Sequence, residues 1–330
     1  MHIFHLRAVC EVVRQGMKIS AAAQSLHKSQ PGISRQVREL EDELGVRIFQ
    51  RRKNKIEVLT PPGREILRVA ERVLRDIDSL KSIGEEHSSQ HVGDLTIATT
   101  HTQARYSLPA VVEAFTHRYP KVRLRLRQGT PDHCSEMVMA GEADIAIATE
   151  AERSFDALVS LPAYTVPRCV VARKGHPILK VRALTLQAIA KYPIITFDQQ
   201  FSGGRSVDAA FAAAGITPRV MMSAVDADVS KAYVERGLGI AILAHAAFDP
   251  ARDRMLRLRD ADHLFRSSVL HVSVRRHAYL RGYMLAFVSA FAPHLTRDLL
   301  ESAVEGGEID MNELGKHVRP LPSRGSARLS

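Results

Sequence analysis

The chain has 330 residues, a formal net charge of +10 and a pI of about 9.7. This length favours two or three domains, and the positive charge favours an acidic partner, of which nucleic acid is the commonest. Three widely spaced cysteines, no signal-peptide core and no long apolar run argue against a secreted disulfide scaffold and a membrane protein, so we expect a cytoplasmic protein.

The first sixty residues predict three helices. Residues 3–13 carry apolar side chains at helical spacing, and a second helix opens at Ser20. The third, "QPGISRQVRELEDELG", follows Ser29, a good N-cap, has Pro31 in its first turn and ends at Gly45, which suits a C′ position. Its buried face is predicted to consist of Ile33, Val37, Leu40 and Leu44.

Helix, tight turn and helix is the arrangement that enters the major groove of DNA. A basic hairpin is predicted next, with a turn near Asn54 and a second strand over residues 56–59. Exposed Gln and Arg side chains can read base edges, and basic hairpin residues can contact phosphates. The predicted DNA contacts are Ser29, Gln30, Pro31, Ser34, Arg35, Arg38, Arg51, Arg52 and Lys53. The alternative is a small helical domain with a solvated basic loop.

The segment "AAAQSLHKSQPGISRQVRELEDELGVRIFQR…LTPPG" resembles the winged helix-turn-helix of the LysR-type transcriptional regulators. The resemblance implies an α/β protein with an N-terminal winged helix-turn-helix, a linker helix and a two-lobed effector domain similar to periplasmic binding proteins. It also implies double-stranded promoter DNA and RNA polymerase as partners, no cofactor and no catalytic residues.

The implied domains are a DNA-binding domain over residues 1–60 and a linker helix with hinge over 61–92. Ile66, Ala70, Val73, Ile77 and Leu80 recur at spacings of four and three, which is typical of a coiled-coil seam. We therefore expect a homo-oligomer, a dimer through this helix and a tetramer by resemblance alone. The alternative is an amphipathic helix that packs on its own domain.

From residue 93 the pattern alternates between strands and helices, which predicts an α/β domain with mainly parallel sheets. The effector domain is predicted over residues 93–304, with a first lobe at 93–162 and 269–304 and a second lobe at 163–268. Residues 305–330 are predicted to form a polar tail.

The stretch "LTIATTHTQARYSLP" places neutral hydrogen-bonding groups where a strand runs into a helix. With "EADIAIATEA" and "DADVSKAYVERGLGI" it resembles the CysB/Cbl branch of the family, regulators of sulfur assimilation. The resemblance implies a small anionic effector, sulfate-like or of the acetylserine type, held by Thr100, Thr102, Gln103, Thr149 and Ser202. Such a site is expected to hold an oxyanion without a fully charged partner. The alternative for the threonines is simple helix capping.

One departure from the family pattern concerns the far wall of the pocket. The chain has one glycine more than the family after Ser202, in "SGGRS", and a helix is expected after Gly204. The sequence does not favour an enzyme, because the side chains of the adjacent residues His133 and Cys134 rarely point to one place and no metal-binding spacing occurs.

A LysR-type regulator of sulfonate utilisation, or of another pathway with a different effector, is the second hypothesis.

Overall fold

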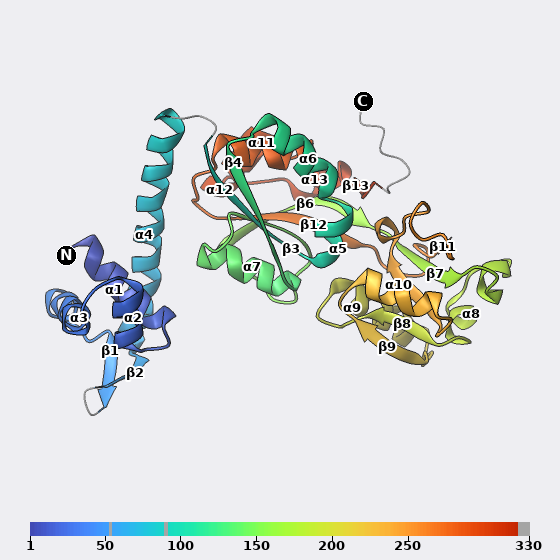
Figure 1. The fold of residues 1–330 in the computed structure, drawn as a ribbon, viewed down its shortest axis with the longest axis horizontal. Helices are drawn as coiled ribbons and strands as arrows, with labels where there is room; N and C mark the ends of the chain where they lie inside the picture. The colour runs from blue at the N-terminus through green and yellow to red at the C-terminus, as the bar shows by residue number, and fades with distance from the viewer. Residues whose placement is uncertain (53–54, 89–91, 323–330) are drawn as a thin grey trace. The chain divides into compact units, whose positions relative to one another are not determined.

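The computed structural model describes residues 1–52, 55–88 and 92–322. The chain divides into two compact units, Met1–His87 and Ser88–Ser330 (Figure 1). Within the described ranges, no helix is both long enough and apolar enough to cross a membrane.

The first unit is a winged helix-turn-helix followed by a long helix, as predicted. Its elements are α1 (Ile3–Arg14), α2 (Ile19–Ser25), α3 (Gln30–Leu44), β1 (Phe49–Arg52), β2 (Lys55–Leu59) and α4 (Pro61–Ser88). The Ser29 hydroxyl accepts a hydrogen bond from the Gly32 amide at 3.2 Å, and Gly45 is left-handed with φ of 67°, so both predicted ends of α3 are confirmed.

The predicted burial of Leu44 is wrong. Ile33, Val37 and Leu40 are fully buried, whereas Leu44 is 40% exposed. The chain leaves the helix immediately after Leu44, and Ile48 and its neighbour Phe49 in β1 complete the core instead.

A buried carboxylate joins α3 to the wing. Glu41 accepts hydrogen bonds from the backbone amides of Ile48 at 2.9 Å and Phe49 at 3.1 Å. The guanidinium groups of Arg47 and Arg51 lie 3.2 Å from its other oxygen. Because a buried carboxylate needs such partners, Glu41 fixes where the wing begins relative to α3.

The first half of α4 packs on its own unit. Ala70 is buried in the core of the winged domain, and Ile66 and Val73 pack against that core. The alternative of packing within one chain therefore holds for these three positions. Leu80, farther along the helix, is 67% exposed, and Val69 is exposed as well, so these two residues remain available for pairing between chains.

We expect Leu80→Asp to weaken self-association without lowering the melting temperature, because it places a charge on an exposed apolar position. Val73→Asp should instead destabilise the winged domain, since that side chain packs against the core. Sedimentation and thermal melts of both variants separate the two effects. An unchanged assembly in Leu80→Asp would remove this face of α4 from the interface.

The second unit contains two sheets. The first has strand order β13-β6-β12-β5-β3-β4, formed by β3 (Gly93–Thr99), β4 (Val122–Gln128), β5 (Ile145–Thr149), β6 (Leu158–Val166), β12 (Ser268–Arg275) and β13 (Arg319–Pro320). The second has order β11-β7-β10-β8-β9, formed by β7 (Arg168–Arg173), β8 (Ile194–Phe197), β9 (Val220–Ala224), β10 (Ile240–Ala244) and β11 (Leu256–Asp260). Each sheet and its helices form one lobe.

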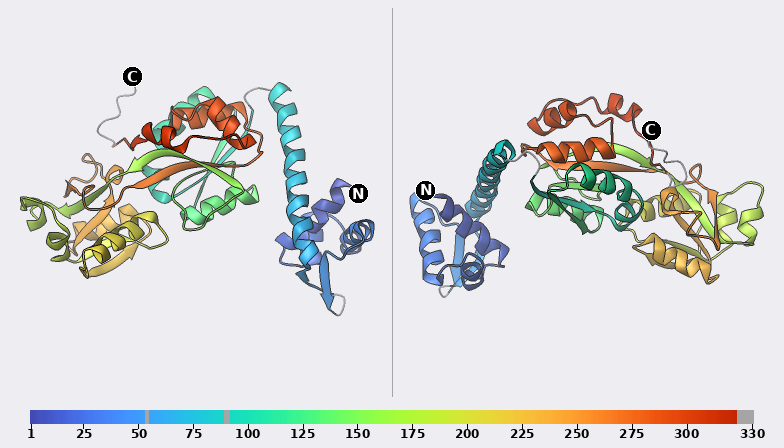
Figure 2. Two further views of the ribbon diagram at one scale, coloured as in Figure 1. Left: turned by 180° about the vertical axis from the view of Figure 1, so that it is seen from behind. Right: turned by 45° about the horizontal axis from the view of Figure 1, so that its top comes forward.

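Both sheets are mixed rather than mainly parallel. In the second sheet β10 is parallel to β8 but antiparallel to β7, and in the first β12 is antiparallel to β5 and β6. Strands β6, β7, β11 and β13 are not among those predicted from the sequence. The chain crosses between the lobes at Pro167 and again between β11 and β12, and Figure 2 shows these crossings side by side, as the pairing of Ser268 with Val166 requires.

Helices pack on both faces of each sheet. The helices of the first lobe are α5 (His101–Tyr106), α6 (Pro109–Arg118), α7 (Pro131–Ala140), α11 (Gly282–Phe291), α12 (Arg297–Glu305) and α13 (Met311–Lys316). Those of the second are η1 (Pro177–Lys180), α8 (Leu186–Ala190), α9 (Ser202–Ala213), α10 (Ala227–Glu235) and η2 (His245–Ala247). In β7, Val171 shares a core with α10, whereas Val170 packs with α8 and α9.

Two predicted boundaries need correction. Strand β6 continues to Val166, beyond the predicted lobe boundary at 162, because its pairing with β12 extends that far. The predicted polar tail is wrong for residues 305–322, where α13 forms and β13 pairs with β6. Leu314 and Leu321 are buried in the core of the unit, and this burial holds the segment in place.

Candidate functional site

The exposed face of α3 carries the predicted base-reading side chains. Ser29, Gln30, Pro31, Arg35 and Arg38 are exposed, and Ser34 is partly so. They run from the N-cap Ser29 to Arg38, toward the N-terminal end of the helix, which contacts base edges in helix-turn-helix proteins.

Arg35 is held in place by a neighbouring carboxylate. Its side chain is 82% exposed, and its Nε donates to Glu39 at 2.7 Å. The second oxygen of Glu39 lies 3.1 Å from the His5 ring. The hydrogen bond from Arg35 lowers the pKa of Glu39. The carboxylate of Glu39, one turn along the helix, therefore orients the Arg35 guanidinium while leaving it exposed to solvent.

The wing residues differ from one another. Arg52 is exposed, as a phosphate contact requires, whereas Arg51 is turned onto buried Glu41 and is only 22% exposed. Arg51 therefore supports the wing from within, in contrast to its predicted role on phosphate. Lys53 lies outside the described residues.

The five predicted effector residues lie together between the two lobes. Thr100, Thr102, Gln103 and Thr149 come from the first lobe and Ser202 from the second, and all five line one small cavity of about 30 Å³. Its apolar walls are Val166, Phe197, Phe201 and Ala244. The cavity lies beyond the carboxyl ends of β3 and β5, where open α/β folds bind ligands.

The local structure leaves hydrogen-bonding groups of Thr100 and Gln103 available to a ligand. Thr100 occupies the N-cap position of α5, yet its side chain makes no capping hydrogen bond. The Gln103 carbonyl accepts a hydrogen bond from the Ser107 hydroxyl at 2.5 Å, so the amide NH₂ is the end left for a ligand. The capping alternative is therefore not supported for Thr100, the residue at the N-cap.

Arg168 also lines the cavity, although it is not among the contacts predicted from the sequence. It is the first residue of β7 and only 4% exposed. Its Nη2 donates to the Ser268 hydroxyl at 2.6 Å, and its Nε has no partner among the described residues. Burial lowers the pKa of Arg168 to about 10, so it is protonated at neutral pH. The expectation of a site without a fully charged group is therefore wrong.

The additional glycine is explained by this arginine. Helix α9 begins at Ser202, so both glycines lie in its first turn rather than before it. A Cβ on Gly203 would lie 2.9 Å from both terminal nitrogens of Arg168, and one on Gly204 would lie 2.5 Å from the Asp198 carbonyl oxygen. Glycine at these positions lets the helix start approach the guanidinium and the end of β8. The Ser202 hydroxyl completes the cluster through a 2.8 Å hydrogen bond to Ser268.

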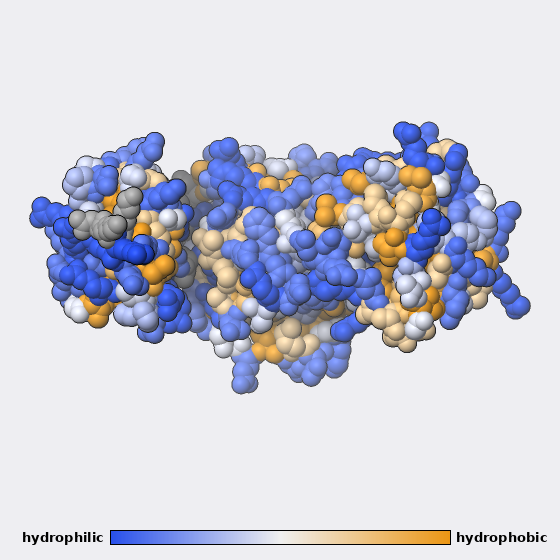
Figure 3. Space-filling model, turned by 90° about the horizontal axis from the view of Figure 1, so that it is seen from below, coloured by the Kyte–Doolittle hydropathy of each residue, from blue (hydrophilic) through white to orange (hydrophobic). Residues whose placement is uncertain are grey.

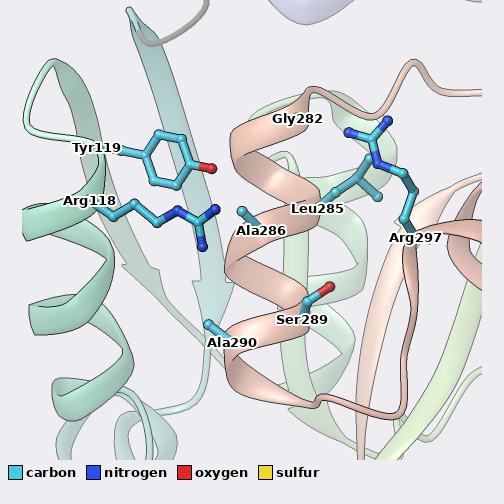
Figure 4. Close-up of a pocket in the computed structure, with 8 residues that line it drawn as sticks. All are labelled: Arg118, Tyr119, Gly282, Leu285, Ala286, Ser289, Ala290 and Arg297. Atoms are coloured by element: carbon cyan, nitrogen blue, oxygen red, sulfur yellow. The ribbon is translucent and has the colours of Figure 1, made fainter.

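Two other hollows lack this convergence. One of about 500 Å³ lies between α6 and α11 (Figure 4), where Arg118 points toward Ala286 and Ala290 and Arg297 lies on the other side of α11. Both arginines are exposed and the side chains on the helix face are small. The other, of about 310 Å³, surrounds His271 and shares only Thr149 with the predicted effector contacts.

The Cys134 thiol behaves as a packing group. It is fully buried, and burial raises its pKa to about 12, so it holds no thiolate near neutral pH. The neighbouring His133 is exposed, so the two side chains have different environments, as expected for adjacent helical residues that do not act together.

Comparisons with known proteins agree with this architecture. Residues 3–64 match the model of the bacterial regulatory helix-turn-helix proteins of the lysR family, and residues 88–296 match the LysR substrate binding domain. The chain is 47% identical to the transcriptional regulator CysB of Burkholderia cenocepacia over 95% of this chain and 100% of that protein. It is 46% identical to the regulator SsuR of the same organism, over 89% of this chain and 96% of SsuR.

Among solved structures, the cofactor-binding domain of the Cbl transcriptional regulator superposes with a TM-score of 0.63 and 38% identity, covering 66% of this chain and 95% of that one. The family matches confirm the expectation of a DNA-binding regulator rather than an enzyme. With both of its units matched, the chain belongs to the LysR family of bacterial transcriptional regulators.

Proposed function

We propose that the protein regulates sulfur assimilation genes in response to a small anion bound between its lobes. The observation that carries the proposal is the convergence of five neutral hydrogen-bonding side chains and the buried guanidinium of Arg168 on one cavity. The likeness to CysB supports the pathway. The likeness to SsuR supports the second candidate, a regulator of sulfonate utilisation.

The chemistry of the cavity favours a compact oxyanion. A protonated arginine in a water-poor space attracts negative charge strongly, and hydroxyl and amide donors on the opposite wall can satisfy several oxygens at once. The cavity of about 30 Å³ is small, which favours a compact sulfate-like ion over a larger ligand. A larger acetylserine-type ligand requires the lobes to separate further.

The first unit is proposed to bind the promoters of the regulated genes. We propose that Gln30, Ser34, Arg35 and Arg38 read base edges while Ser29, Pro31, Arg52 and Lys53 lie along the backbone. The target is double-stranded promoter DNA in the cytoplasm, with RNA polymerase as the further partner.

We propose a homo-oligomer that joins through two surfaces. The exposed positions of α4 form one of them. The second lies on the second lobe, where Val220, Met221, Val225, Val229 and Tyr233 are exposed. Figure 3 shows hydrophobic residues gathered on the lower face of this lobe. Apolar surface of this kind is typical of protein interfaces and supports a dimer or tetramer.

We expect Arg35→Ala to weaken binding to the specific promoter by about 1–3 kcal/mol and binding to random DNA far less. Arg52→Ala should weaken both alike and flatten the salt dependence, because a phosphate contact carries no sequence information. Titrations of both variants at several salt concentrations provide the comparison. Equal losses on the two DNAs for Arg35→Ala would exclude base reading by this residue.

We expect Thr102→Ala to weaken anion binding about ten- to a hundredfold, as for loss of a hydrogen bond to a charged group. Thr102→Ser retains the hydroxyl and should bind nearly normally. Calorimetry and melting curves are to be run together on both variants. A lower melting temperature with unchanged affinity would make Thr102 a structural residue only.

Arg168→Met should abolish most anion affinity while leaving the ligand-free protein at least as stable as the wild type, since it removes a buried charge. Arg168→Lys should restore part of the affinity, because it keeps the charge but not the planar fork. Affinity and ligand-free melting temperature are the two measurements. A drop in melting temperature with unchanged affinity would give Arg168 a purely structural role.

A further inference from the structure

A cluster of charged and hydroxyl groups bridges the two lobes beside the effector cavity. Helix α5 of the first lobe faces α10 of the second. The Tyr106 hydroxyl contacts the Asp228 carboxylate and accepts a hydrogen bond from Lys231 Nζ at 2.8 Å. Arg105 forms an ion pair with the same Asp228. One turn earlier, His101 Nδ1 lies 3.2 Å from Asp226.

The half of this cluster in the second lobe is built rigidly. Lys231 is 5% exposed and donates to the Ala247 carbonyl at 3.0 Å and to Asp253 at 3.1 Å. Asp253 in turn accepts from the Asp249 amide at 2.8 Å. Because Ala247 and Asp253 belong to the second lobe, they orient the Lys231 ammonium before it donates to the Tyr106 hydroxyl of the first lobe.

The half in the first lobe belongs to the effector site itself. Helix α5 has only six residues. Its first turn carries Thr102 and Gln103, and its last residue is Tyr106. Gln103 and Tyr106 are three residues apart on the same buried face, so fixing one fixes the other. Burial raises the pKa of Tyr106, which keeps its hydroxyl protonated for donation to Asp228.

We propose that Tyr106, Asp228 and Lys231 form an inter-lobe latch that positions Thr102 and Gln103 opposite Ser202 and Arg168. These three are positioning residues, and the proposal rests on the proposed anion site. The latch and the ligand both bridge the lobes, so each favours the closed arrangement. Only closed molecules offer all the ligand contacts. The apparent dissociation constant is therefore the intrinsic one divided by the fraction of molecules that are closed. The latch thereby sets the concentration to which the sensor responds.

The latch has a direct test in the full-length chain with sulfate as the probe. Tyr106→Phe removes the hydroxyl and keeps the packed ring, and Asp228→Asn removes the charge that holds Arg105. Each variant should bind sulfate about tenfold more weakly, the size expected for one hydrogen bond to a charged group. The matched control is Arg153→Ala, which breaks ion pairs to Asp132 and Glu136 within the first lobe alone.

A distance measurement separates positioning from general damage. Spin labels on Glu113→Cys in α6 and Glu235→Cys in α10 report the separation of the lobes, with labelled chains diluted into unlabelled ones. Without sulfate, both latch variants should show longer or broader distances than the wild type, and Arg153→Ala should not. Unchanged distances in the latch variants overturn the proposal, even where affinity falls.

The same experiment distinguishes failure of the latch from failure of the proposed function. If the wild-type chain binds no sulfate, the anion site fails, and the ligand-free distances alone decide whether the latch holds the lobes together. If the wild type binds sulfate and both latch variants bind it equally well, the site stands and the latch is wrong.

Discussion

The burial of one guanidinium at the junction of two sheets constrains the whole effector unit. Arg168 opens β7 directly after the first crossing between the lobes, where its charge is removed from water. Such a charge is costly unless polar groups surround it. Ser268, at the start of the returning strand β12, and Ser202, at the start of α9, form one hydrogen-bonded cluster with it. Gly203 provides the room. Both crossings and the wall of the cavity therefore meet at this side chain.

The first unit uses the opposite charge in the same way. Glu41 is a buried carboxylate that collects two backbone amides and two arginines at the point where α3 gives way to the wing. In each unit a buried ion lies next to the surface that meets the ligand or the DNA, Glu41 with four hydrogen-bond donors around it and Arg168 with the Ser268 hydroxyl. This arrangement makes orientation, rather than stability, the main contribution of the two ions.

The latch and the cavity share the short helix α5. Ligand binding at one end of this helix is therefore coupled to the separation of the two lobes at the other end. The polar groups of α5 at one end face the ligand space, and those at the other end face α10. A ligand that bridges Thr102 and Arg168 strengthens the same closed arrangement that Tyr106 and Lys231 favour. Differential affinity for the closed state is what allows a small anion to shift a conformational equilibrium.

Local patterns in the sequence were enough to predict the winged helix-turn-helix and the ends of α3, because N-caps and left-handed glycines depend on neighbouring residues. The resemblance to the family, rather than a local pattern, singled out the five residues that line one cavity between the lobes. Arg168 and the roles of Arg51 and Leu44 depended on tertiary structure. A lone arginine before "CVVA" looks like any strand-edge charge until β12 and α9 are seen to surround it. The pairing of Tyr106 with Asp228 and Lys231 joins residues more than a hundred positions apart. Contacts of that range arise only when the two crossings bring the lobes together, so no local pattern encodes them.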